Sequence, residues 1–237
     1  MWFFGIKKRN LERVTTEARK ACSDLRELRC ADRLDQSFGT SYSAEDISGN
    51  YSITVTGGDG LAFVTNAHTR EDGGANWSNR VTDGSTVNMD WEYDALKAAH
   101  RTAALVTNPR GKPTNIKLDT FVCTRGFATH NRAEEMLGAI NKGWIVGSAD
   151  RDKSATPGYK IIPTPWITTN TLYWWMFDSS MKNAIQGFQY KESQGIELEG
   201  PNIVFKTGEI QWKATMLFDM GFNNSRNWVG SQDTNSS

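Results

Sequence analysis

The three histidines are the first residues to test for chemistry, because imidazole binds metal ions and exchanges protons near neutral pH. They are His68, His100 and His130. No two of them stand four residues apart, as they would on the helix of a zinc site, and none lies beside a cluster of acidic residues. The sequence therefore predicts no metal site and calls for no cofactor.

The three cysteines are the next candidates for chemistry. Cys22, Cys30 and Cys123 form neither an even disulfide set nor a CxxC pair. Cys22 and Cys30 fall on one stripe of a predicted helix, where a buried cysteine usually packs as a small hydrophobic residue. We expect reduced thiols that serve packing, as in a cytosolic protein.

Motifs for nucleophilic catalysis and phosphate binding are absent from the sequence. It contains no GxSxG nucleophile elbow, no GxxxxGK(S/T) loop and no GxGxxG fingerprint. A catalytic triad is assembled in space, so the sequence alone leaves one open. The carboxylate pairs Glu134-Glu135 and Glu197/Glu199 would suit a glycosidase, but a helix surface and a strand edge explain them. We predict that the chain is not an enzyme.

An aromatic group offers a second kind of binding chemistry. Its members are Trp166, Tyr173, Trp174, Trp175 and Phe177. Such a group could stack on sugars, but aromatic residues in a strand more often fill a core. Successive strand residues face opposite sides, so either Trp174 or Trp175 is expected to meet a partner subunit.

The composition excludes several classes of protein. With 237 residues the chain is long enough for one large domain or two lobes. Its 27 basic and 27 acidic side chains cancel, which argues against a dedicated nucleic-acid-binding module. No apolar run approaches the roughly 20 residues of a membrane span. The apolar stretch after Met1 is ended by Lys7, which makes it too short for a signal peptide. We expect a soluble, intracellular protein without a membrane partner.

The first third of the chain shows both helical and strand periodicity. A helix is predicted over 11–34, where apolar or small residues recur every three or four positions. Alternation predicts a half-buried strand over 51–55, glycines predict a turn at 57–60, and a returning strand is expected over 61–64. The stretch 66–84, rich in Gly, Asn and Asp, is predicted to be an exposed loop.

The remainder alternates helices with strands and then becomes β-rich. Helices are predicted over 91–106 and 128–140, around a strand at 116–123. Short β segments are predicted at 159–162, 171–177, 203–205 and 210–218. The small polar tail 231–237 has nothing to bury and is expected to be disordered.

One passage resembles a known family. Asp59-Gly60-Leu61-Ala62-Phe63 is followed by Asn66-Ala67-His68 and, after a glycine-rich loop, by Ser78-Asn79. This passage is similar to one in the major capsid proteins of tailed phages, which have the Hong Kong 97-like fold, and most closely to the Mu-like head-subunit branch. Further similar segments lie at 111–113, 133–137, 161–165, 172–178 and 221–231. The resemblance thus covers about residues 11–231.

The resemblance implies an α+β capsid fold with a long spine helix, a peripheral lobe and an axial lobe. The expected divisions are 1–86 for the N-terminal remnant, spine helix and peripheral strands, 87–157 mainly for the axial lobe, 158–231 for return strands of the peripheral lobe, and 232–237 for a disordered tail. Family members carry an N-terminal arm and an extended loop before the spine helix. Only about ten residues precede that helix in this sequence, so both are expected to be missing.

The function that the resemblance implies is structural. The chain is expected to assemble in the cytoplasm of a bacterial host, through pentamers and hexamers, into the icosahedral capsid of a tailed phage or prophage. Scaffold, portal or decoration proteins would be further partners, and packaged DNA would be touched only non-specifically. The candidate subunit-contact residues are Trp2, Phe3, Phe4, His68, Asn79, Trp174 and Trp175.

Two alternatives stay open. An encapsulin-like nanocompartment shell protein would share the fold and differ in its cargo. A carbohydrate-binding or hydrolytic β-rich domain, built around the aromatic strands, belongs to another class.

Overall fold

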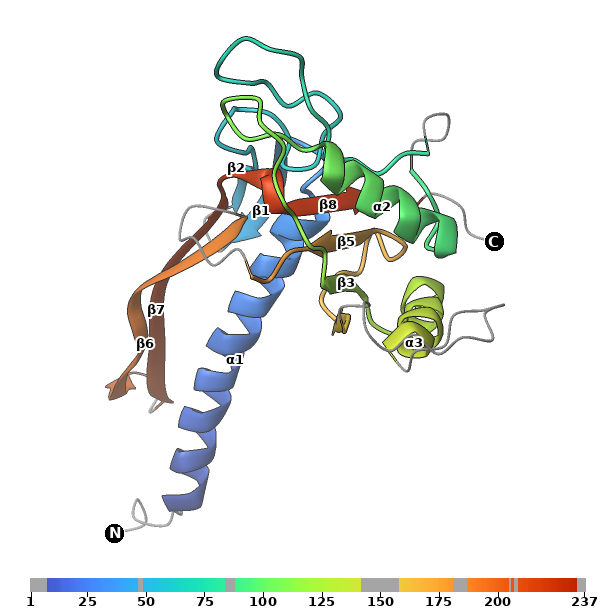
Figure 1. The fold of residues 1–237 in the computed structure, drawn as a ribbon. Helices are drawn as coiled ribbons and strands as arrows, with labels where there is room; N and C mark the ends of the chain where they lie inside the picture. Colours follow the sequence, from blue (N-terminus) through green and yellow to red (C-terminus); the bar gives the residue numbers. More distant parts are fainter. Residues whose placement is uncertain are drawn as a thin grey trace. The chain divides into compact units, whose positions relative to one another are not determined.

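The fold is shown in Figure 1 as a computed structural model. The structure describes residues 8–46, 49–83, 88–141, 158–180, 187–204, 206 and 209–233. Helix and strand account for 29% and 34% of the chain, so the predicted α+β class is confirmed. The described strands form two two-stranded sheets and one four-stranded sheet.

Helix α1 (Lys8–Asp35) is the longest helix of the described part of the chain and confirms the prediction over 11–34. Its 28 residues extend for about 42 Å at 1.5 Å per residue. Ala31 and Leu34 near its end are buried, whereas Val14 and Leu25 remain 43% and 45% exposed. Within the described residues, no helix combines the length and apolar character that a bilayer crossing needs.

The chain divides into two compact units. The first comprises Met1–Cys30 and Tyr190–Met220, and the second comprises Ala31–Gln189 and Gly221–Ser237. The first unit therefore combines most of α1 with most of two long strands, β6 (Phe188–Val204) and β7 (Glu209–Phe222) (Figure 1).

The four-stranded sheet belongs to the second unit. Its order is β4 (Lys160–Thr164), β3 (Thr120–Thr124), β5 (Trp174–Phe177), β8 (Trp228–Ser231). Strand β3 pairs parallel with β4 and antiparallel with β5, and β5 pairs antiparallel with β8. The domain boundary predicted at 157/158 therefore separates strands that hydrogen-bond to one another, and it does not divide the structure.

Two hydrophobic clusters pack in the second unit. One joins β3 to α2 (Tyr93–Leu105) and α3 (Ala128–Asn141), the two helices predicted at 91–106 and 128–140. The other joins the end of α1 to Phe63, Ile167 and Trp228. Strand β5 supplies both clusters, because Trp174 enters the first and Trp175 enters the second.

A hairpin of β1 (Ser41–Asp46) and β2 (Gly49–Thr54) corrects one predicted pairing. The strand predicted at 51–55 exists as β2, but its partner precedes it instead of following at 61–64. After the turn, one bridge joins Thr56 to Ala62, and the chain then leaves the strand direction so that Phe63 becomes buried. Strand β2 is also not half-buried, since five of its six residues are exposed.

The stretch predicted as an exposed loop at 66–84 is irregular in its described part but is not exposed throughout. His68, Trp77, Asn79 and Val81 are all at least 93% buried. Two backbone hydrogen bonds join His68 to Trp77, and the Val81 N–H donates to Gly230 O on the outer side of β8. The loop therefore covers the edge of the sheet and forms part of the core.

The C-terminal prediction also needs correction. Ser231 ends β8 and is fully buried, and Asp233 is 5% exposed, so order continues beyond the predicted start of the tail at 231. Residues 234–237 lie outside the described residues. Strand β6 begins at Phe188, well before the short segment predicted at 203–205.

Candidate functional site

Four of the seven predicted contact residues lie in the interior. Trp174, Trp175 and Asn79 are 0% exposed and His68 is 1% exposed. A side chain without exposed area offers no surface to a neighbouring subunit, so these four residues are not contact residues through their side chains. Trp2, Phe3 and Phe4 lie outside the described residues.

The two tryptophans are satisfied within the chain. The indole N–H of Trp174 donates to Met89 O, and that of Trp175 donates to Ser37 Oγ, each at 3.0 Å. Buried indoles need such a partner. The pair therefore serves the two hydrophobic clusters and presents no sugar-stacking platform.

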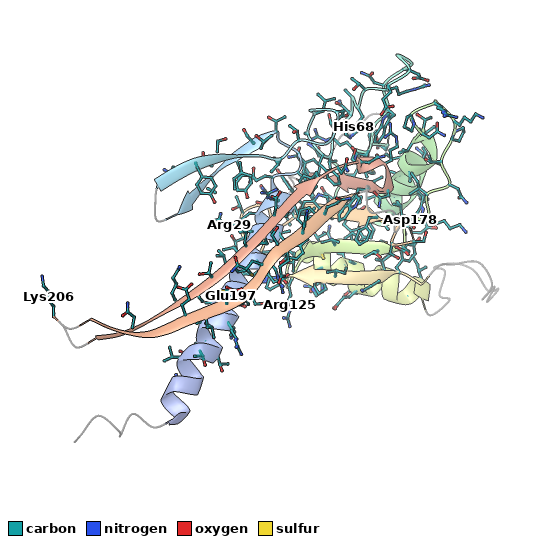
Figure 2. The ribbon with its side chains drawn as sticks, turned by 90° about the vertical axis from the view of Figure 1, so that its left-hand side faces the viewer. Arg29, His68, Arg125, Asp178, Glu197 and Lys206 are labelled. Carbon is teal, nitrogen blue, oxygen red and sulfur yellow. The ribbon has the colours of Figure 1, made fainter. Side chains whose placement is uncertain are left out.

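His68 and Asn79 belong to a buried polar cluster with two residues that sequence reasoning did not assign to a site. His68 Nδ1 lies 2.6 Å from Asp59 Oδ2, and Nε2 lies 3.1 Å from Asn79 Oδ1 and 3.0 Å from Ser225 Oγ. We call these four residues the His68 cluster. Figure 2 shows His68 among the side chains of the surrounding loops. Asp59 lay in the passage that resembles capsid proteins, whereas no motif marked Ser225, which is 157 residues from His68.

Three segments position the cluster. Asp59 lies in the glycine turn, where its carboxylate accepts the Leu61 N–H at 3.2 Å. The Gly58 N–H donates to Asn223 O at 3.2 Å, which joins this turn to the C-terminal segment. Ser225 begins the short 3₁₀ helix η2 (Ser225–Asn227), and Asn224 caps that helix by accepting the Arg226 N–H. Local turn chemistry thus holds Asp59 and Ser225 on either side of His68.

The atoms Asp59–His68–Ser225 follow the order of a catalytic Asp–His–Ser triad. A general base requires an unprotonated Nε2 facing the serine hydroxyl. Asn79 bears on this point, because its Oδ1 accepts the Thr65 N–H at 2.9 Å and its Nδ2 donates to Phe63 O at 2.8 Å. The amide orientation is thereby assigned from the hydrogen-bond network, with Oδ1 facing His68.

A hydrogen on His68 Nε2 would satisfy the Asn79 amide oxygen at 3.1 Å, whereas a lone pair on Nε2 would accept the hydrogen of the Ser225 hydroxyl at 3.0 Å. With a hydrogen on Nε2, the ring would not take the proton from Ser225, and the cluster would lack the base that a triad needs.

An aromatic and cationic stack covers the cluster. The His68 and Trp77 rings stack with centroids 4.2 Å apart, and the Arg226 guanidinium lies 5.2 Å from the Trp77 ring centre. Arg226 Nε also donates to Thr107 O at 2.8 Å. Burial lowers the pKa of Arg226, and the charges of Glu71 and Asp59 oppose that shift.

A pocket of about 380 Å³ lies beside the cluster. Its lining includes Asp59, Trp77 and Ser225, together with Arg70, Glu71 and Arg226. Arg70 is paired with Asp72, and the side-chain hydrogen bond from Arg70 is the main cause of the lowered pKa of Asp72. The lining thus mixes both signs of charge. In the described part of the chain, no group of three His, Cys, Asp or Glu residues could hold a metal ion.

The other two histidines have separate surroundings. His100 Nε2 lies 2.7 Å from the Tyr159 hydroxyl, and burial lowers the pKa of His100. His130 pairs with Glu134 one turn later on α3, at 3.3 Å. Neither histidine contacts the His68 cluster in the hydrogen bonds described here.

We expect the stability of the chain to fall in mild acid because of His100. Since its folded-state pKa lies below the usual 6.5, the unfolded chain takes up the proton first as the pH falls. The contribution of neutral His100 to the free energy of unfolding is complete above pH 6.5. It is lost as the pH falls from 6.5 toward the folded-state pKa of His100. Urea unfolding of wild type and His100→Gln across this range should give a shallower pH dependence for the variant, and equal dependences would contradict the prediction.

Cys123 is buried in β3, while Cys22 and Cys30 on α1 are partly exposed, and none of the three forms a disulfide. Burial raises the pKa of the Cys123 thiol to about 12, and the Glu134 charge adds to this. A protonated, inaccessible thiol is inert, which supports the packing interpretation for Cys123.

Thiol titration of the native chain should therefore detect Cys22 and Cys30 before Cys123. We expect Cys123 to react with a disulfide reagent only after urea is added, because the reagent attacks the exposed thiolate. Peptide mass spectrometry after timed labelling would identify each site. Rapid labelling of Cys123 in the native chain would show that β3 opens.

The first unit carries a different kind of candidate site, a set of exposed apolar side chains. Val14 and Leu25 on α1, and Tyr190 and Leu217 on β6 and β7, are 39–57% exposed. We call these four residues the unit 1 apolar surface. Locally, Arg26 lies 5.7 Å from the Tyr190 ring centre, and the Tyr190 and Phe218 ring centroids are 6.0 Å apart. These contacts cover only part of the apolar area of the unit.

Comparison of the chain with protein-family models, curated proteins and solved structures found no match.

Proposed function

We propose that the chain is a major capsid subunit of a tailed bacteriophage or prophage, with a Hong Kong 97-like fold. Its function would be to assemble into the icosahedral shell that encloses the DNA genome, without catalysing a reaction. The sequence passage from Asp59 to Asn79 suggests the family. The observation that carries the proposal is that the first structural unit has few elements and leaves apolar side chains exposed.

That unit has too few helices and strands to bury all of its own apolar side chains. It contains most of a 28-residue helix and most of two strands of 17 and 14 residues. A two-stranded ribbon is marginally stable in water unless something packs against it. The unit 1 apolar surface nevertheless remains exposed. Such a unit is typical of a subunit whose burial is completed by neighbouring copies.

The order of elements also supports the proposal. The resemblance implies that a spine helix comes first and that C-terminal strands return to the same lobe. Residues 1–30 and 190–220 do share one compact unit. The second unit does not follow the expected division, because its four-stranded sheet joins β3 of the expected axial lobe to β4, β5 and β8 of the expected peripheral lobe.

Assembly would depend on many weak contacts between copies. In closed rings of five or six subunits, modest affinity at each contact is multiplied by valency. The formal net charge of zero suits a wall that tolerates packed DNA without binding it tightly. Portal, scaffold and decoration proteins would be its other partners, and the virion would be its location.

Hydrolysis is the second candidate function, because the distances along Asp59–His68–Ser225 suit a triad. The contact between Asn79 Oδ1 and His68 Nε2 opposes it. Incubation with a fluorophosphonate probe would decide between them. Covalent labelling of Ser225, lost in Ser225→Ala, would favour a hydrolase, whereas an unlabelled native chain agrees with a structural role.

The experiment that tests the capsid proposal is size-exclusion chromatography with light scattering, followed by negative-stain microscopy. Pentamers, hexamers or shells of the purified chain would support it. A monomer at every concentration would contradict self-assembly by this chain and would favour the binding-domain alternative. The genes beside its own would separate a phage, with portal and terminase genes, from a nanocompartment with a cargo enzyme.

A further inference from the structure

The protonation of His68 can be derived from its neighbours, one nitrogen at a time. As described above, the Asn79 amide is fixed by one donor to its oxygen and by two acceptors, Phe63 O and Ser225 O, for its nitrogen. The 3.1 Å contact from Asn79 Oδ1 therefore favours a hydrogen on His68 Nε2.

The other nitrogen faces a carboxylate. Nδ1 lies 2.6 Å from Asp59 Oδ2, a separation at which two lone pairs repel. A hydrogen must lie between these atoms as well. The pair thus holds one proton more than an aspartate with a neutral imidazole.

We propose that His68 is a buried imidazolium that donates from both ring nitrogens and joins Asp59, Asn79 and Ser225. Loss of that proton would release part of the cluster. The inference does not depend on the proposed capsid function, because it follows from contacts within one compact unit.

The surrounding charges suit this state. Asp59 supplies the counter-charge, and its side chain is 22% exposed while that of His68 is 1% exposed. A buried charge is tolerated when it is paired and hydrogen-bonded. The positive Arg226 lies on the Trp77 ring that His68 also stacks against, and it opposes the imidazolium. Glu71 and Arg70 line the neighbouring pocket with opposite charges.

Deprotonation has two routes, and each breaks a contact. If Nδ1 loses its hydrogen, a lone pair faces the Asp59 carboxylate. If Nε2 loses its hydrogen, a lone pair faces Asn79 Oδ1. Either way the link between the glycine turn, the loop and the C-terminal η2 helix weakens. The cluster is therefore complete only while both ring nitrogens carry a hydrogen.

The test is nitrogen-15 NMR of the full chain with labelled histidine. Long-range proton–nitrogen spectra separate an imidazolium, whose two nitrogens resemble each other, from a neutral ring with one unprotonated nitrogen. We expect His68 to show the imidazolium pattern at neutral pH. A neutral ring with unprotonated Nε2 would overturn the proposal and would restore a base for Ser225.

Two variants isolate the cause. Asp59→Asn removes the counter-charge, so the imidazolium pattern of the His68 nitrogens should be lost at neutral pH. Glu134→Gln, which removes the carboxylate beside His130, should leave the His68 signal unchanged. If Asp59→Asn does not fold, the wild-type spectrum is the test. An unchanged His68 spectrum in folded Asp59→Asn would contradict the pairing.

Discussion

Replacing Trp175 with alanine is expected to destabilise the folded chain by about 3–5 kcal/mol. Trp175 is 0% exposed and lies in the cluster that joins the end of α1 to the sheet. The substitution removes the ring beside Phe38, whose centroid is 6.1 Å away, and leaves the Ser37 hydroxyl without its indole donor. Because domains are stable by only about 5–15 kcal/mol, the loss should be large in urea unfolding.

Trp166→Ala is the matched control for this prediction. Trp166 packs against the same cluster but is only partly buried, so its removal should cost less. Ser37→Ala tests the polar contribution, since it leaves the Trp175 N–H unpaired at a cost of about 1–3 kcal/mol. A Trp175→Ala variant as stable as Trp166→Ala would show that the second cluster is not a core.

The second large effect is expected on assembly. Replacing Leu25 and Leu217 together with serine should abolish rings or shells while the chain stays folded. These side chains are 45% and 57% exposed, so each replacement removes about half of a leucine's burial in the folded chain. Each change should lower the free energy of unfolding by about 1 kcal/mol, which a folded domain tolerates. In a shell the loss would be repeated at every copy, so a modest weakening of each contact prevents assembly.

The matched control is Lys20→Ser with Lys213→Ser. Both lysines are exposed in the same unit, and their replacement removes charge instead of apolar area. Light scattering and negative-stain microscopy would compare the two double variants with the wild type, and circular dichroism would confirm their folding. If the leucine variant assembles as well as the lysine variant, the unit 1 apolar surface is not a subunit contact.

Helical periodicity predicted the three helices within a few residues. Helices α1, α2 and α3 were expected at 11–34, 91–106 and 128–140, and they lie at Lys8–Asp35, Tyr93–Leu105 and Ala128–Asn141. Each packs one stripe of side chains, at least in part, against other elements. That stripe leaves a repeat of three and four in the sequence.

Two strands were missed because their sequences are mainly polar. Strand β1 is Ser-Tyr-Ser-Ala-Glu-Asp, and the first half of β6 is also mainly polar. Neither carries the run of β-branched and aromatic residues that signals a strand. Their pairing depends on backbone hydrogen bonds, whose partners the side-chain pattern does not specify, so the sequence predicted a wrong partner for β2.

The candidate site, too, was determined partly by the sequence and partly by the tertiary structure. The sequence alone determined the α+β class, the three helices and the absence of recognised catalytic motifs, because these depend on local spacing. It also singled out His68 and Asn79, but as contact residues. Only the tertiary structure brought Ser225 to His68 across 157 residues and turned the Asn79 oxygen toward the ring. Hydrogen-bond direction depends on which atoms meet in space, and that direction decides whether His68 is a base or a buried cation.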